Sequence, residues 1–262
     1  MRLTVDGSDV YAYTGSRRFD PARRTIVFVH GAANDHSVWT LQSRYFAHHG
    51  ANIVAVDLPA HGRSGGTPLA SVEAIADWLA AMLDAAGIER ATLVGHSLGA
   101  LAALECAARQ PARVAKLALL GPAAPMSVSD VLLDAARRDD HVAYELITGW
   151  SYSPGRQLGG NPAPGMWMTG NALRLMERLR PGVLSCDLVA CNVYANAPAA
   201  AAVVRCPALL VLALRDIMAP VRNAQVLVDT LADARVVTLP DTGHAMMAER
   251  PDAVLDALRG FV

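Results

Sequence analysis

Short apolar runs alternate with amphipathic, helix-like segments along most of the chain. The run Thr25–Val29 is unbroken and rich in β-branched residues, which is typical of a strand buried on both faces. Between Ser71 and Ala86, apolar side chains recur at helical spacing, and Ser71 and Gly87 are residues typical of helix ends. The same criteria predict strands at 53–56, 91–94, 114–120, 208–214 and 235–239, helices at 98–109, 221–231 and 251–261, and a hairpin of strands at 3–5 and 10–13.

Strands that alternate with helices predict an α/β fold with a mostly parallel β-sheet covered on both faces. The alternation stops between Gly121 and about Val204, where the pattern predicts helices at 131–138, 142–148, 171–179 and 183–194. Three prolines and four glycines between Ser153 and Gly165 predict a loop. We therefore expect a single domain over residues 1–262, with a core of residues 1–120 and 205–262 and a helical lid inserted at residues 121–204.

Composition and charge narrow the classes of partner. A chain of 262 residues with 53% hydrophobic and 18% charged residues can bury a sizeable core, and its formal net charge is −1. It has no arginine- or lysine-rich run, so neither nucleic acid nor an anionic membrane is an expected partner. It begins without the apolar stretch of a signal peptide and has no run of membrane-spanning length, so we expect a cytoplasmic protein. The sequence leaves the oligomeric state open.

The four cysteines lack the spacing of metal ligands. Cys106, Cys186, Cys191 and Cys206 form no Cys-x-x-Cys pair, and no histidines cluster with them, so a metal site is not expected. We interpret them as free thiols in the core of a protein from a reducing compartment. A Cys186–Cys191 disulfide is the less favoured alternative.

The stretch Gly95-His96-Ser97-Leu98-Gly99 lies between a predicted strand and a predicted helix. A Gly-x-Ser-x-Gly sequence at such a junction is typical of a tight, strained turn, because glycine lets the strand and the helix approach closely. The turn raises the serine hydroxyl clear of the sheet, where a base and a substrate can both reach it. Ser97 is therefore a candidate nucleophile, and the chain is a candidate hydrolase.

A serine hydroxyl needs a base that removes its proton during attack, and a carboxylate that orients this base. In a parallel sheet these groups come from the carboxyl ends of strands, where the loops converge. Asp216 follows the predicted strand at 208–214, and His244 follows the strand at 235–239. We therefore place the base at His244 and its carboxylate at Asp216. Asp241 is a competing carboxylate, but its position favours the start of the turn that delivers His244.

The order Ser97, Asp216, His244 resembles that of the α/β-hydrolase family, and the resemblance covers nearly the whole chain. Five motifs at predicted strand ends carry it: Val29-His30-Gly31-Ala32-Ala33, Asp57-Leu58-Pro59-Ala60-His61-Gly62-Arg63-Ser64, Gly95-His96-Ser97-Leu98-Gly99, Arg215-Asp216-Ile217-Met218-Ala219-Pro220 and Gly243-His244. The resemblance implies the α/β-hydrolase fold with a helical lid. It also implies that Ser97 is the nucleophile, that His244 is first general base and then general acid, and that Asp216 orients it.

The resemblance further implies an oxyanion hole formed by two backbone N–H groups, those of Ala32 and Leu98, the second at a helix N-terminus. Two small side chains, Ala32 and Ala33, follow His30-Gly31, which indicates room beside the oxyanion hole. Ala33 and Trp167 are the predicted substrate-pocket residues, Trp167 because it lies on a Gly/Pro-flanked segment.

Four polar residues of the motifs are interpreted as structural. His30 and His96 are flanked by motif glycines, and Asp57 and His61 are expected to hold their own loop by hydrogen bonds. Ala60 stands where the family usually has a glycine. None of these residues is assigned a direct part in the chemistry.

We predict a serine hydrolase that cleaves a small or medium, largely apolar carboxylic ester through an acyl-enzyme intermediate. Its partner is a small-molecule ester, and neither a cofactor nor a metal is expected. Carbon–carbon bond hydrolysis, perhydrolysis and lyase chemistry on the same three side chains are alternatives within the fold. A ligand-binding receptor with little turnover is a more remote alternative of another class. Fold analogy does not name the substrate, because function depends on the site.

Overall fold

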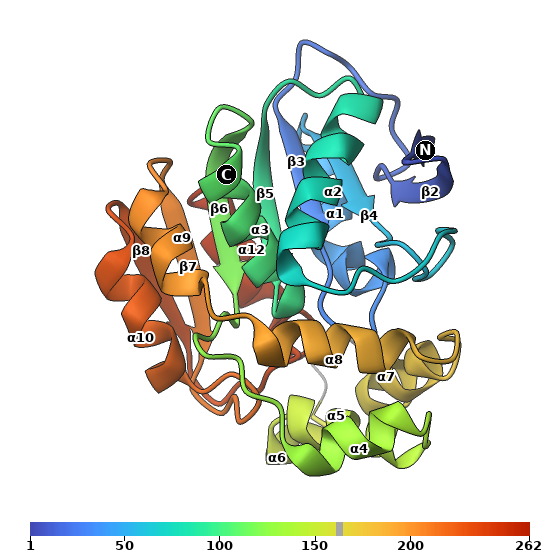
Figure 1. The fold of residues 1–262 in the computed structure, drawn as a ribbon. Helices are drawn as coiled ribbons and strands as arrows, with labels where there is room; N and C mark the ends of the chain where they lie inside the picture. The colour runs from blue at the N-terminus through green and yellow to red at the C-terminus, as the bar shows by residue number, and fades with distance from the viewer. Residues whose placement is uncertain (161–164) are drawn as a thin grey trace.

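An eight-stranded sheet forms the centre of the computed structural model, which describes residues 1–160 and 165–262 (Figure 1). The strands are β1 (Arg2–Val5), β2 (Ser8–Tyr13), β3 (Thr25–Val29), β4 (Asn52–Val56), β5 (Ala91–His96), β6 (Val114–Leu120), β7 (Ala208–Ala213) and β8 (Ala234–Leu239). Their order across the sheet is β1-β2-β4-β3-β5-β6-β7-β8. The β1–β2 and β2–β4 pairs are antiparallel, and all other neighbours are parallel. The predicted hairpin and mostly parallel sheet are therefore confirmed.

Two layers of helices cover the sheet, one on each face. One layer holds α2 (Val72–Ala85), α3 (Leu98–Arg109), α9 (Ala197–Val203) and α10 (Val221–Thr230), and the other holds α1 (Thr40–His48) and α12 (Pro251–Arg259). In β3, Val27 and Val29 belong to the first apolar core, whereas Ile26 and Phe28 belong to the second. Successive side chains of a strand point to opposite faces, so a strand covered on both sides is apolar throughout.

Helices α4–α8 lie at the carboxyl ends of the parallel strands, below the sheet in Figure 1. They are α4 (Asp130–Arg137), α5 (Val142–Ser151), α6 (Pro154–Gln157), α7 (Met168–Met176) and α8 (Val183–Val193). A separate apolar cluster joins α4, α5, α7 and α8 to Ala33, in the loop after β3, through Leu132, Leu133, Ala136, Ala143, Met176, Leu184 and Leu188. In contrast, α9 packs beside the sheet on α3 and α10. The division of the chain at residues 121 and 204 remains a prediction.

Predicted and observed elements agree to within a few residues where the apolar pattern is strong. The sequence pattern missed the 3₁₀ helix η1 (His36–Trp39), α1, α9 and the short α11 (Met246–Glu249). In α1 the buried face includes the polar residues Gln42 and Ser43, so its sequence has no clear apolar period. The loop prediction for 153–165 is corrected at α6, a single helical turn that begins with Pro154. Residues 161–164 of that predicted loop lie outside the described residues.

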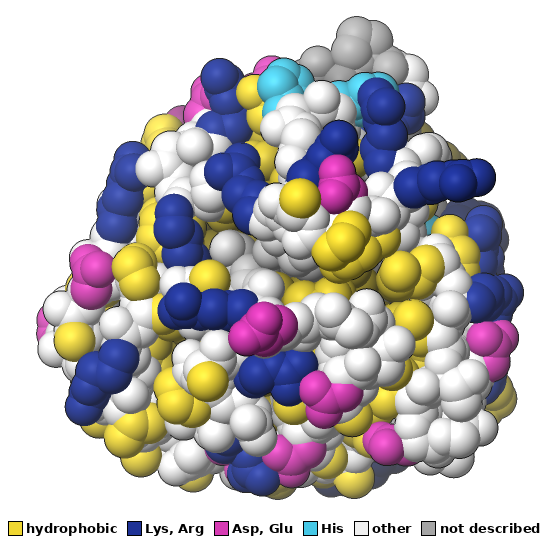
Figure 2. Space-filling view, turned by 90° about the horizontal axis from the view of Figure 1, so that it is seen from above, with side chains coloured by type: hydrophobic (Ala, Val, Ile, Leu, Met, Phe, Trp, Pro, Cys, Tyr) yellow, Lys and Arg dark blue, Asp and Glu magenta, His cyan; other side chains and the backbone are white. Residues whose placement is uncertain are grey.

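Figure 2 shows the face of the molecule at the amino ends of the strands, opposite α4–α8. Arginine side chains on this face are interspersed with acidic and apolar ones. Two ion pairs reach acidic residues of α2: Arg109 pairs with Asp77 at 2.8 Å, and Arg113 pairs with Asp84 at 2.6 Å. Within the described residues, none of the helices is long and apolar enough to cross a bilayer.

All four cysteines, which lie within the described residues, are free thiols. Cys106 and Cys191 are buried, whereas Cys186 and Cys206 are partly exposed. The prediction of free thiols is therefore confirmed, and the expectation that they are core residues holds for two of the four.

Candidate active site

Ser97 occupies a strained turn between β5 and α3. Its φ of 53° and ψ of −119° lie where side chains with a Cβ are rarely found. A Cβ on Gly95 would lie 2.1 Å from the carbonyl oxygen of Gly99, and a Cβ on Gly99 would lie 2.4 Å from that of His30. The backbone of α3 thus nearly touches that of β5 at Gly95 and that of the end of β3 at Gly99, which explains both glycines of the motif.

Asp216 and His244 meet at the carboxyl ends of β7 and β8. The Nδ1 atom of His244 donates a hydrogen bond of 2.6 Å to Oδ2 of Asp216, and both side chains are buried. The other carboxylate oxygen, Oδ1, accepts hydrogen bonds from the backbone N–H groups of Met218 and Ala219 at 2.9 and 2.7 Å. One oxygen therefore holds the turn after β7, while the other keeps the Nδ1 proton in place and leaves Nε2 of His244 free to accept a proton.

The loop that carries His244 is held from two sides. The Nε2 atom of His96 donates to the carbonyl oxygen of His244 at 3.0 Å, and the Ala245 N–H donates to the carbonyl oxygen of Ser151 at 2.9 Å. Burial, with the nearby His244 ring, lowers the pKa of His96 well below its ordinary value. His96 is thus a neutral donor that fixes the backbone of His244, consistent with its interpretation as structural.

Ser97 and His244 line the same space, although no hydrogen bond joins them in the described part of the chain. The hydroxyl of Ser97 instead lies 3.9 Å from Sδ of Met126 and donates to it. Catalytic hydrogen bonds are often long or misaligned without substrate and tighten in the complex. The structure therefore brings the Asp216–His244 pair together and places Ser97 beside the same cavities.

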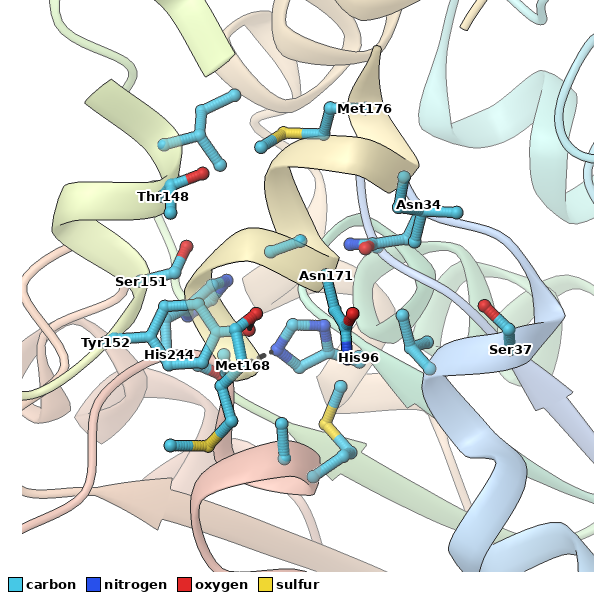
Figure 3. A pocket seen from close by; sticks show the side chains of 18 of the residues that line it. Asn34, Ser37, His96, Thr148, Ser151, Tyr152, Met168, Asn171, Met176 and His244 are labelled. Carbon is cyan, nitrogen blue, oxygen red and sulfur yellow. Dashed lines mark hydrogen bonds between the residues drawn. The ribbon is translucent and has the colours of Figure 1, made fainter. Parts of the chain in front are cut away.

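Two cavities meet at these residues. The larger measures about 560 Å³ and is shown in Figure 3, where His96 and His244 lie at one end and Met176 and Thr148 lie on the far side. The smaller measures about 300 Å³. Both are lined by Ala32, Ser97, Leu188, Met218 and His244. An ester placed at Ser97 would therefore have room for a substituent on each side.

Two backbone N–H groups near Ser97 have no hydrogen-bond acceptor among the described residues: those of Ala32 and Leu98. Leu98 is the first residue of α3, where helical N–H groups have no partner within the helix and the helix dipole favours negative charge. Ala32 lines both cavities. These are the two donors predicted for the oxyanion hole, and each N–H could donate a hydrogen bond to a developing oxyanion.

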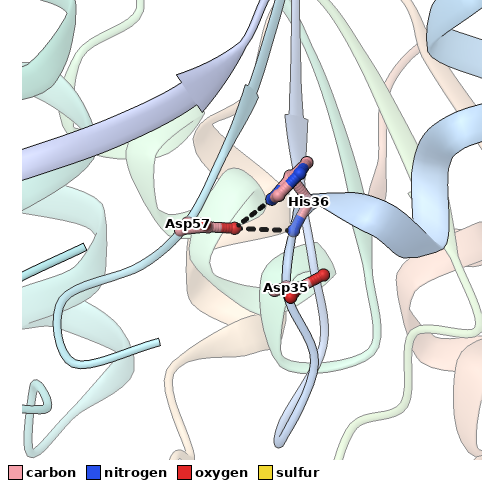
Figure 4. A group of neighbouring side chains, drawn as sticks. All are labelled: Asp35, His36 and Asp57. Atoms are coloured by element: carbon pink, nitrogen blue, oxygen red, sulfur yellow. Dashed lines mark hydrogen bonds and ion pairs between the residues drawn. The ribbon is translucent and has the colours of Figure 1, made fainter. Parts of the chain in front are cut away.

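Asp35, His36 and Asp57 form a cluster whose oxygen and nitrogen atoms lie within 4.8 Å of one another (Figure 4). Protein donors already occupy both carboxylate oxygens of Asp57. Oδ1 of Asp57 accepts from the backbone N–H and Nδ1 of His36 at 2.7 and 2.8 Å, and Oδ2 accepts from the Arg63 N–H at 2.9 Å. Burial raises the pKa of Asp57, but these hydrogen bonds outweigh it and the pKa is lowered. The cluster therefore joins two loops as a hydrogen-bonded unit.

The two predicted pocket residues lie elsewhere. Ala33 is buried in the apolar cluster of α4–α8, and Trp167 is 68% exposed, with its ring close to Gly170 in the first turn of α7. Neither lines the two cavities described above. The cavities are instead lined by methionine and aromatic side chains, among them Met126, Trp150, Tyr152, Met168, Met218 and Met247. Methionine and tryptophan are abundant between residues 126 and 176 of the sequence, but only packing shows which of these side chains face the cavities.

The match to known proteins agrees with this geometry. A model of the alpha/beta hydrolase family matches residues 26–257. The chain belongs to the alpha/beta hydrolase family. This alpha/beta hydrolase is 32% identical over 236 residues to the pimeloyl-[acyl-carrier protein] methyl ester esterase of Chromobacterium violaceum, which covers 84% of this chain and 87% of that protein.

Two further comparisons link the alpha/beta hydrolase to other known proteins. Over 123 residues it is 37% identical to the dihydrolipoyllysine-residue acetyltransferase component of the acetoin cleaving system of Cupriavidus necator. The match covers 45% of this chain and 30% of that longer protein. The solved structure of the enol-lactonase from Burkholderia xenovorans LB400 superposes with a TM-score of 0.87 at 20% identity, over 100% of this chain and 99% of that chain. The predicted α/β-hydrolase fold is therefore confirmed.

Proposed function

We propose that this alpha/beta hydrolase is a serine hydrolase that cleaves carboxylic esters through an acyl-enzyme. One observation carries the proposal: the imidazole of His244, oriented by Asp216 over 2.6 Å, lines the same cavities as Ser97 in its strained turn. The relative from Chromobacterium violaceum, a methyl ester esterase, supports ester hydrolysis as the reaction class.

In the first half of the proposed reaction, rotation about the Cα–Cβ bond turns the Ser97 hydroxyl from Met126 toward His244. Its Oγ attacks the ester carbonyl carbon while Nε2 of His244 takes the proton. The carbonyl oxygen becomes an oxyanion held by the N–H groups of Ala32 and Leu98. When the carbon–oxygen bond breaks, the alcohol leaves with the proton from His244, and Ser97 stays acylated.

In the second half, water replaces the alcohol. His244 removes a proton from the water, whose oxygen attacks the acyl carbon and forms a second oxyanion on the same two N–H groups. Collapse of this intermediate releases the carboxylic acid and returns the proton to Oγ of Ser97. Asp216 stays ionised throughout and stabilises the imidazolium that forms in each half.

The two cavities support an ester of medium size with an apolar substituent on each side of the carbonyl. In the larger cavity, Ile147, Met168 and Met176 supply apolar wall. In the smaller one, Leu132 of α4, Trp150 of α5 and Leu188 of α8 close the space. Since both walls come largely from α4–α8, we propose that these helices act as a lid that sets the size of the substrate.

The test is a Ser97→Ala variant assayed on a panel of p-nitrophenyl esters that differ in acyl length. Removal of the nucleophile is expected to lower kcat by about four to six orders of magnitude, because only binding and the oxyanion donors remain. Incubation of the wild type with a fluorophosphonate should add one label at Ser97, detected by mass spectrometry of the intact protein and its peptides.

The matched control is Ser43→Ala. Ser43 is buried, like Ser97, but its hydroxyl donates to the Thr40 carbonyl oxygen within α1, and it does not line either cavity. We expect turnover within about twofold of the wild type. Undiminished turnover in Ser97→Ala would refute the serine mechanism.

A further inference from the structure

Asp187, on α8, is a buried carboxylate that contacts the loop bearing the proposed oxyanion donor. It is 2% exposed. Its Oδ2 accepts a hydrogen bond from the backbone N–H of Ala33 at 2.9 Å and a second from Nε2 of His61, also at 2.9 Å. One oxygen atom thus joins three segments: α8, the loop after β3 and the loop after β4.

The contact with Ala33 bears directly on Ala32. The two residues supply consecutive N–H groups, and fixing the peptide plane that carries the Ala33 N–H restricts the backbone rotation of Ala32. Ala33 itself has a φ of 61°, a left-handed conformation that is strained for a non-glycine residue. The buried hydrogen bond to Asp187 offsets this strain and holds the loop in the form in which Ala32 lines the cavities.

His61 balances the charge of Asp187. Both ring nitrogens of His61 face acceptors, since Nδ1 lies 3.0 Å from the Pro59 carbonyl oxygen and Nε2 lies against Asp187. A ring with acceptors at both nitrogens is best satisfied when it is doubly protonated. Burial lowers the pKa of His61, but the charge and hydrogen bond of Asp187 outweigh it, and the pKa is raised. The pair therefore places no net charge beside an oxyanion that a lone carboxylate would destabilise.

We propose that Asp187 is a positioning residue for the oxyanion hole. From α8, its carboxylate accepts from the N–H of Ala33 and so holds the loop that carries the Ala32 N–H. The inference rests on the proposed function, because it assigns to Asp187 an effect on the same acyl-transfer step. It couples the position of α8 to the activity of the site: when α8 moves away, the loop at Ala32 loses its buried acceptor.

The experiment compares the wild type with Asp187→Asn and Asp187→Ala. Asparagine keeps a carbonyl oxygen at the position of Oδ2, whereas alanine removes the acceptor. We expect kcat/KM to fall roughly ten- to a hundredfold in Asp187→Ala, less than the 10²–10³ typical of losing an oxyanion donor outright. KM should stay within about threefold, and Asp187→Asn should recover most of the loss. Asp187→Ser, with a side chain too short to reach Ala33, replaces the alanine variant if the latter does not fold.

A second readout separates positioning from folding. An aryl trifluoromethyl ketone forms an oxyanion on the serine, so its Ki should rise by the same factor by which kcat/KM falls. Glu105→Gln and Glu105→Ala are the controls. Glu105 is an equally buried carboxylate, 2% exposed, that accepts from Tyr194 and Asn196 at 2.6 and 2.9 Å. These controls should lose stability while kcat/KM and Ki stay within about twofold.

The outcomes distinguish the two proposals. If Ser97→Ala is inactive but Asp187→Ala matches the wild type in kcat/KM and Ki, the positioning role is wrong and the proposed function stands. If the Glu105 variants lose as much kcat/KM as the Asp187 variants, the effect is general destabilisation and the positioning role is again wrong. If the wild type shows no Ser97-dependent hydrolysis, both proposals are overturned.

Discussion

At the scale of single residues, Asp216 performs two tasks with its two oxygen atoms. Oδ1 accepts from two backbone N–H groups of the turn after β7, and Oδ2 accepts from His244. The first task fixes where the carboxylate lies, and the second fixes which nitrogen of His244 carries the proton. The two tasks can be separated by a substitution that keeps one oxygen.

Asp216→Asn makes that separation. The asparagine oxygen can still accept from Met218 and Ala219, so the turn keeps its shape. Its NH₂ group then faces Nδ1 of His244, which forces the ring proton onto Nε2 and removes the base. We expect kcat to fall by about 10⁴ while the free energy of unfolding changes by less than about 1 kcal/mol. Steady-state kinetics and urea denaturation measure the two effects, and a loss of activity that follows a loss of stability would contradict this account.

The candidate catalytic residues can be predicted from the sequence, because the order of their motifs along the chain indicates them. Ser97, Asp216 and His244 each follow a predicted strand, and the structure brings the last two into contact. The partners of the structural polar residues could not be predicted. His36 had no recognisable pattern, yet it binds Asp57, because that contact depends on how two loops pack.

At the scale of secondary structure, the turn at Ser97 depends on the close approach of β5 and α3 to β3. Gly99 packs its Cα against the carbonyl groups of Val29 and His30, at the end of β3. The turn is thus strained at Ser97 and held in place by a backbone contact that admits no side chain.

Gly99→Ala tests this contact. The added Cβ would lie 2.4 Å from two carbonyl oxygens, so β3 and α3 have to separate. We expect a loss of at least about 3 kcal/mol in the free energy of unfolding, together with loss of esterase activity, because Ser97 moves with the helix. Gly149→Ala in α5 is the control, since a Cβ there meets nothing within 4 Å, and it should leave stability unchanged or raise it. Equal stabilities for the two variants, measured by urea denaturation, would contradict the close-contact account.

The sequence predicts best the helices that are buried on one face and the strands that are buried on both faces. The strands of the sheet and helices α2 and α3 carry unbroken or periodic apolar patterns, and their observed bounds lie close to the predicted ones. Helix α1 was missed because Gln42, which donates to carbonyl groups of Met247 and Pro251, fills a buried position with a polar side chain. A buried polar residue whose partners lie far along the chain leaves no local signal.

At the scale of the whole molecule, buried histidines link stability to pH. His30 is fully buried, donates from Nδ1 to the Gly31 carbonyl oxygen and accepts at Nε2 from the Leu58 N–H. Burial, with the nearby charge of His61, lowers the pKa of His30 to about 4, from an ordinary value of 6.5. Folding therefore opposes protonation of His30 between these two values.

The stability that neutral His30 contributes is present above pH 6.5 and is lost as the pH falls toward about 4, because the unfolded chain binds the proton first. We expect the wild type to lose its stability advantage over His30→Gln as the pH is lowered through this range. Urea denaturation of both proteins at several pH values measures the difference. Two curves that run parallel from pH 7 to pH 4.5 would show that His30 does not carry this linkage.

The sequence alone determined the strands and most helices, the mostly parallel sheet and the three side chains chosen for chemistry. Apolar periodicity, glycine positions and the order of motifs are local properties that can be seen in the chain itself. Only the tertiary structure decided which side chains line the cavities and that Asp187 meets His61 and Ala33, which lie 126 and 154 residues away along the chain. Those contacts depend on the packing of α8 over the loops after β3 and β4, and no local sequence pattern records that packing.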